Sequence, residues 1–160
     1  MLSASGELNF KMGGPGFRPF TVRIFNSFLY TPADPEGPEY TRRSIYRHVV
    51  TSLKDPLLDA LDCPDPSVKT PRRAVTTTPL QSVELMNSAF VLSRSRAFAL
   101  RVEREAGGDP KKRIELAYRL AYGRAPSEAD SARAAEFAAK EGLESLAWTL
   151  FNSSEFLYLR

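Results

Sequence analysis

Residues 78–108 read TPLQSVELMNSAFVLSRSRAFALRVEREAGG, and this stretch decides the fold class. Thr78 and Gln81 form a capping box, in which each side chain accepts a hydrogen bond from the other residue's backbone NH. Proline in the first helical position and the two closing glycines strengthen the start and stop signals. The pattern predicts one long helix over residues 79–106, the longest of the chain. Residues 83–92 are apolar on most faces, which predicts that this part is a buried central helix.

The same start and stop signals recur downstream. Asp109-Pro110 begins a predicted helix that ends at Gly123, and Ser127 caps another that ends at Gly142. A last helix covers residues 143–152. The short connections between these three helices predict antiparallel packing.

A further helix is predicted upstream, because Thr41 can cap residues 42–53, where apolar side chains recur every four positions. Pro56 opens a short helical turn over residues 57–61. A loop with three prolines follows, over residues 62–77. Together these signals predict a mainly α fold, a bundle of about five helices.

The first forty residues differ from the rest because they are rich in glycine and proline, which favour turns and extended chain. Residues 20–30 are rich in aromatic and β-branched side chains. They fit either a short strand or an aromatic arm lying on a helical core. The sequence therefore predicts an irregular, aromatic-rich arm over residues 1–40 and a helical domain over residues 41–160.

Composition excludes several functions. The net charge of +3 is small and the charges are interspersed, which argues against a nucleic-acid binder. One cysteine, Cys63, and one histidine, His48, cannot form a closed metal or haem site, so no cofactor is expected on this chain. No apolar run reaches the roughly 18 residues of a membrane span.

Four arginines are the candidate binding residues, for an oxyanion: Arg42, Arg43, Arg72 and Arg73. The planar guanidinium suits carboxylates, phosphates and sulfates. The same region carries its own acids, so the arginines could instead form Arg–Asp pairs that pin the proline-rich loop. We favour this structural role. The acids are Asp55, Asp59, Asp62 and Asp65.

Nucleophilic catalysis has little support. Ser44 and His48 would touch on a helix at a spacing of four, but no orienting acid or oxyanion hole accompanies them. Cys63 lacks a neighbour that would lower its pKa, so a packed or idle thiol is expected. The stretch Gly13-Gly14-Pro15-Gly16 lacks the spacing and the strand–helix context of a phosphate loop and is interpreted as a turn.

Several motifs resemble a known family, the domain of unknown function 1553. They cover nearly the whole chain, and the block over residues 57–91 is the most specific. The motifs are RRSIY (42–46), LLDALDCPDPS (57–67), TPRR (70–73), TTTPLQ (76–81), MN (86–87), FV (90–91), YRLAYGRAP (118–126) and LFNSSEFLY (150–158).

The resemblance implies that the chain is the C-terminal part of a larger exported bacterial protein, with a cytochrome-c-like domain at its N-terminus. Residues 1–40 would then be the severed remainder of an upstream part. The expected partners are the upstream domains of the same polypeptide, and self-association is expected of the chain alone. The implied function is a non-catalytic structural or interaction module. The alternative is a partial substrate-binding region of an enzyme that acts on polysaccharide or another oxyanion-bearing substrate.

Overall fold

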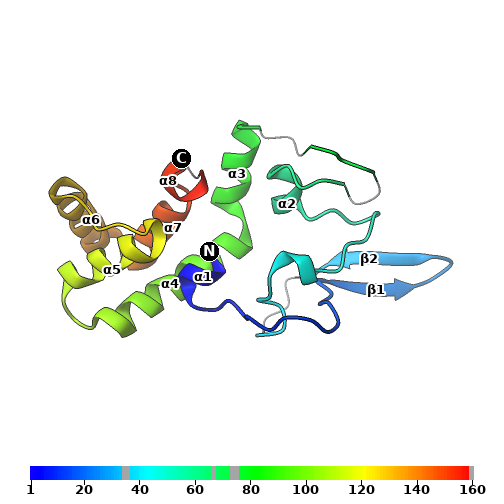
Figure 1. Cartoon of the computed structure of the whole chain (residues 1–160), viewed down its shortest axis with the longest axis horizontal. Helices are drawn as coiled ribbons and strands as arrows, with labels where there is room; N and C mark the ends of the chain where they lie inside the picture. The colour runs from blue at the N-terminus through cyan, green and yellow to red at the C-terminus, as the bar shows by residue number, and fades with distance from the viewer. Residues whose placement is uncertain (34–36, 66–67, 73–75, 159–160) are drawn as a thin grey trace. The chain divides into compact units, whose positions relative to one another are not determined.

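The structure is a computed structural model, and it describes residues 1–33, 37–65, 68–72 and 76–158. The expected mainly α class is confirmed, since helices dominate and the only sheet among the described residues has two strands (Figure 1). The chain forms two compact units. We call Met1–Glu7 with Met86–Arg160 the helical unit, and Leu8–Leu85 the hairpin unit.

The helical unit is built from amphipathic helices joined by short turns. Their bounds are α1 Leu2–Ser5, α4 Ala89–Ala106, α5 Pro110–Tyr122, α6 Glu128–Glu141, α7 Leu143–Phe151 and α8 Ser154–Leu157. The predicted starts are confirmed: the Asp109 side chain accepts from the Lys111 NH at 2.9 Å, and Ser127 and Asp130 form a capping box. Gly123 ends α5 in the left-handed conformation (φ 72°), which glycine adopts without strain.

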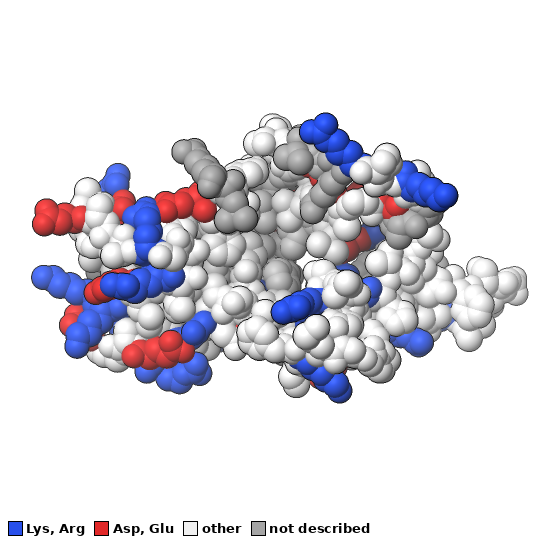
Figure 2. Space-filling model, viewed as in Figure 1, with Lys and Arg blue, Asp and Glu red and all other residues white. Residues whose placement is uncertain are grey.

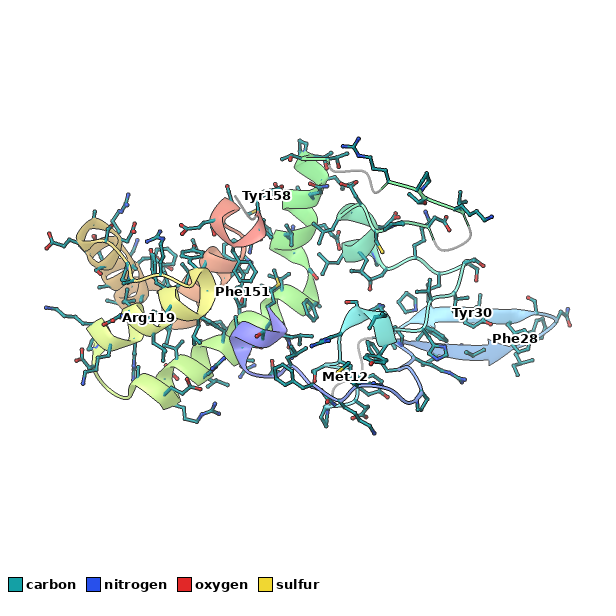
Figure 3. The ribbon with its side chains drawn as sticks, in the orientation of Figure 1. Met12, Phe28, Tyr30, Arg119, Phe151 and Tyr158 are labelled. Atoms are coloured by element: carbon teal, nitrogen blue, oxygen red, sulfur yellow. The ribbon has the colours of Figure 1, made fainter. Side chains whose placement is uncertain are left out.

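The core of the helical unit lies between α4 and α7. Phe98 and Phe151 are fully buried with ring centroids 5.1 Å apart, in an edge-to-face arrangement (Figure 3). Val91, Val102 and Ala117 are also fully buried. Helix α1 is fastened to α4 by arginine, because the Arg101 guanidinium donates to the carbonyl oxygens of Ser3 (3.1 Å) and Ala4 (2.8 Å).

The hairpin unit contains strands β1 Phe20–Ile24 and β2 Phe28–Pro32, the 3-10 turn η1 Ser44–Tyr46, helix α2 Pro56–Ala60 and most of helix α3 Pro79–Asn87. The strands pair antiparallel, so of the two alternatives for residues 20–30 the structure has a strand, in a hairpin (Figure 1). The boundaries of these two units differ from the expected ones, which placed an arm over residues 1–40 and a helical domain over residues 41–160.

The predicted helix over residues 42–53 is wrong. Only Ser44–Tyr46 is helical there, as a single 3-10 turn. Extended chain replaces the helix because the backbone pairs with the N-terminal arm instead of with itself: Phe17 NH donates to the Tyr46 carbonyl and His48 NH to the Phe17 carbonyl, both at 2.8 Å. The Thr41 hydroxyl donates to the Pro38 carbonyl, so it does not serve as the predicted helix cap.

The prediction of one helix over residues 79–106 is also wrong, although its capping box at Thr78 is confirmed. The chain leaves helical geometry at Ser88 (ψ 125°), and the longest helix is α4 rather than the one that starts at Pro79. In a continuous helix the Met86 carbonyl would accept from the backbone four residues on. Here it accepts from the Trp148 indole NH at 3.2 Å, so a tertiary contact takes over that hydrogen bond.

The expected burial of residues 83–92 is wrong for most of the segment. Leu85 and Val91 are buried, whereas Val83, Met86 and Leu92 are exposed. The prediction of burial on most faces assumes one continuous helix. The break at Ser88 reorients the two halves, so each buries only a narrow stripe.

Candidate functional site

Of the predicted binding residues that the structure describes, only Arg42 is buried, with 6% of its surface exposed. Its guanidinium donates to the backbone carbonyl oxygens of Lys11 (3.1 Å), Gly13 (2.7 Å) and Pro15 (2.8 Å). It also lies 3.7 Å from the ring centroid of Tyr46, a cation–π contact. Its two terminal NH2 groups thus hold the glycine-rich turn, whereas its buried Nε has no hydrogen-bond partner among the described residues.

The turn itself depends on glycine. Gly13 and Gly14 have φ near +73°, in the left-handed region, as expected for a tight turn. A Cβ at Gly16 would lie 2.8 Å from Cδ2 of the His48 ring, so a side chain does not fit there. The Gly13 NH donates to the Tyr46 hydroxyl at 2.8 Å. Arg42 and Tyr46, both from the RRSIY motif, therefore shape this turn.

The other predicted arginines lie apart from it. Arg43 and Arg72 are exposed, and their guanidinium groups make no hydrogen bond or ion pair with another residue that the structure describes. Arg73 lies outside the described residues. Neither of these two described guanidinium groups therefore shares a contact with that of Arg42.

Three of the acids of this region contact Arg47 or Lys54. Asp55 pairs with Arg47 and accepts from the Leu58 NH at 2.9 Å as the cap of α2. Lys54 lies 3.4 Å from Asp59 and 3.9 Å from Asp65. An Arg–Asp pair of the expected kind is therefore present, between Arg47 and Asp55.

Asp62 fastens the end of the proline-rich loop, a role that the sequence interpretation missed. Its carboxylate accepts from the Thr76 NH at 2.7 Å and from the Thr76 hydroxyl at 2.9 Å. Gln81, which is 5% exposed, donates to it at 3.4 Å. Motif residues far apart in sequence thus form one hydrogen-bonded cluster at the start of α3. The resemblance to the family was the signal that could have singled out Asp62.

A pocket of about 260 Å³ lies within the hairpin unit. His48 and Cys63 line it, but the three described candidate arginines and Ser44 do not. Its two cations, Arg47 and Lys54, are paired with aspartates, so neither is free for an oxyanion. The remaining walls are mostly apolar: Pro19, Phe20, Pro32, Ala33, Val49, Val50, Leu53, Pro56, Leu58 and Pro64.

Outside this pocket the hairpin unit points large apolar side chains to solvent. Ile24, Phe25 and Ile45 are 78%, 84% and 85% exposed. Phe28 and Met12, labelled in Figure 3, are 64% and 72% exposed. In the view of Figure 2 the protruding end of the β1–β2 hairpin shows no charged side chain, whereas charged side chains lie close together over the helical unit. Apolar side chains gathered on a surface mark an interaction site.

The helical unit has a polar cluster of its own, formed by residues of the YRLAYGRAP (118–126) and LFNSSEFLY (150–158) motifs. Arg124 binds both carboxylate oxygens of Glu155, at 2.5 and 2.8 Å, and lies 3.4 Å from Asp130. The Tyr122 hydroxyl donates to Ser153 at 2.9 Å. Burial raises the pKa of Tyr122. The hydrogen bonds from Ser127, assisted by Arg124, hold the pKa of Asp130 below its usual value.

Two further observations bear on function. Among the described residues, no group of three or more His, Cys, Asp or Glu side chains is arranged to hold a metal ion. No helix within the described part of the chain is long and apolar enough to span a bilayer.

The fold and the site define a mainly helical protein with two units. The helical unit has a buried apolar core, and the hairpin unit has few buried apolar side chains. The chain belongs to the family described as PSD1, protein of unknown function (DUF1553), which it matches over residues 1–138. No curated protein and no solved structure matches the chain.

Proposed function

We propose that this chain is a non-catalytic interaction module of a larger, exported multidomain protein, and that its hairpin unit docks against the remaining domains of that polypeptide. The module carries no cofactor of its own, because one histidine and one cysteine cannot make a closed metal site.

The observation that carries the proposal is the poor burial of the hairpin unit. Of its described apolar side chains, only Pro19 and Leu85 are buried. Burial of apolar surface is the main favourable term in folding, so a unit that lacks it needs a partner surface. Polar anchors such as Arg42 and Asp62 fix its loops but do not remove its apolar side chains from water.

The motif residues support a structural rather than a catalytic role. Arg42 holds carbonyl oxygens, Asp62 fastens a loop, and Arg124 joins α8 to the start of α6. Side-chain groups that already make these contacts are not available to bind a substrate. The alternative, binding of polysaccharide or another oxyanion-bearing substrate, would rest on exposed Arg43 and Arg72, which no contact brings together.

Export and the larger context follow from the family resemblance alone. Members that resemble this chain combine the domain with a cytochrome-c-like domain in exported bacterial proteins. The docking proposal depends only on the hairpin unit, so it can be tested separately.

Hydrogen exchange tests the proposal. Amides of residues 8–33 are compared between the purified 160-residue chain and the natural gene product in which it occurs, with α4 and α7 as internal controls. We expect protection of residues 8–33 to rise by at least about tenfold in the natural product, equivalent to about 1.4 kcal/mol of local stability. Equal exchange in both samples would refute the docking proposal.

A further inference from the structure

The β1–β2 hairpin has one apolar face and one polar face. Residues directly opposite in an antiparallel pair share a face, and the faces alternate along each strand. One face therefore carries three wholly apolar pairs: Phe20 with Pro32, Val22 with Tyr30 and Ile24 with Phe28. The other face carries Thr21 with Thr31 and Arg23 with Leu29. Such alternation is typical of a sheet with one face packed and one face in water.

The apolar face is uncovered in this chain. Val22, Phe28 and Ile24 are 41%, 64% and 78% exposed, increasing toward the tip of the hairpin. Phe20 and Tyr30, at the base, are half-buried and pack edge to face at 5.4 Å. Phe28 stacks beside Tyr30 at 6.5 Å (Figure 3). A two-stranded hairpin is marginal in water by itself, so it needs a covering surface.

Charge indicates the chemistry of that covering surface. The apolar face carries no charged residue, so its partner is apolar at the centre. Residues 8–33 contain no Asp or Glu but do contain Lys11, Arg18 and Arg23. Arg23 lies on the polar face, so a rim of carboxylates on the partner would complement Lys11 and Arg18.

The size of the face indicates where the partner lies. Two five-residue strands present a face of roughly 160 Å², from a rise of about 3.3 Å per residue and a strand spacing of about 4.8 Å. Stable association of separate proteins buries about 800 Å² on each partner. A tether raises the effective concentration to the millimolar range, and a small surface then suffices. These magnitudes favour a partner in the same polypeptide.

From these observations we propose that the apolar face of the β1–β2 hairpin docks onto an apolar protein surface rimmed by carboxylates, located in the same polypeptide outside these 160 residues. This inference rests on the proposed function and specifies the docking element and the chemistry of its partner.

Photo-crosslinking in the natural gene product tests it. Ile24→p-benzoylphenylalanine and Phe28→p-benzoylphenylalanine probe the apolar face, and the same replacement of Thr21 and Thr31 probes the polar face. We expect the first pair to give intramolecular crosslinks to peptides outside this chain, in several-fold higher yield than the second pair. Arg18→Glu should lower the Ile24 yield, whereas Arg43→Glu, an exposed control in the same unit, should not.

Four outcomes overturn the inference: equal yields from both faces, crosslinks only to a second copy, crosslinks only to added anionic lipid vesicles, and an Ile24 yield that Arg18→Glu leaves unchanged. A probe at Ile45, exposed elsewhere in the hairpin unit, separates the two proposals. If Ile45 crosslinks to the rest of the polypeptide and Ile24 does not, the module docks by another surface and only the hairpin inference fails. If neither does, both proposals fail.

Discussion

The two units of this chain are stabilised in different ways. Of the buried apolar residues in the described chain, Pro19 and Leu85 lie in the hairpin unit and the other thirteen lie in the helical unit. The hairpin unit instead holds its loops with long-range polar contacts, such as Arg42 to the turn at Gly13 and Asp62 to Thr76. The net contribution of a hydrogen bond to the free energy of unfolding is smaller than that of burying a large apolar side chain. We therefore expect the hairpin unit to be less stable than the helical unit.

Phe98→Ala should have the largest effect, because it removes a fully buried ring from the helical core. We expect a loss of about 3–5 kcal/mol in the free energy of unfolding, measured by denaturant titration. Leu100→Ala, on the same helix but 58% exposed, is the matched control and should cost far less. Equal losses would mean that the core is not where the structure places it.

Arg42→Ala should destabilise the hairpin unit by about 1–3 kcal/mol, because three carbonyl oxygens lose their charged donor. The exposed neighbour Arg43 provides the control, and Arg43→Ala should stay within about 0.5 kcal/mol of the parent. Limited proteolysis of residues 8–33 reports the local change. If cleavage is as slow in Arg42→Ala as in Arg43→Ala, the proposed anchor role is wrong.

Ser127→Ala should cost about 1 kcal/mol, because it removes the acceptor that caps α6. The loss should appear in the unfolding of the helical unit and leave proteolysis of residues 8–33 unchanged. Glu128→Ala, at the next position, keeps the capping oxygen and serves as the control. An effect of Ser127→Ala on the hairpin unit alone would contradict the local role of the cap.

The Asp130 carboxylate should make part of this stability depend on pH. Its pKa is lowered in the folded chain by the Ser127 hydrogen bonds and Arg124. A group with a lowered folded pKa stabilises above its unfolded pKa, and this contribution is lost as the pH falls through the folded pKa. The difference in unfolding free energy between the parent and Asp130→Asn should therefore shrink from pH 7 to about pH 3. A constant difference would show that Asp130 is not coupled to folding.

The double variant Phe25→Ser with Phe28→Ser should change stability least, since both side chains are mostly exposed. It should nevertheless lower dye binding and self-association, which light scattering measures, because exposed apolar patches drive both. Thr21→Ser with Thr31→Ser is the control on the polar face. If the unsubstituted chain is a monodisperse monomer that binds no dye, the claim that the hairpin unit exposes an apolar surface is wrong.

Local signals in the sequence predicted the helical unit well. Asp109-Pro110, Ser127 and Gly123 each act on backbone groups within one helical turn, so their effect does not depend on the rest of the fold. The mainly α class follows from the same signals. Of the site, the sequence singled out Arg42 but not its partners, because carbonyl oxygens carry no signature in the side-chain sequence.

The errors fall where contacts are non-local. The apolar spacing over residues 42–53 suits a helix, but the N-terminal arm supplies hydrogen bonds that make extended chain more stable there. The helix break at Ser88 coincides with an indole NH from Trp148 in place of a helical donor. Sequence by itself determined which segments are able to form helices and where most of them start and stop. Only the tertiary structure decided which of those helices form, because partners distant in sequence compete for the same backbone groups.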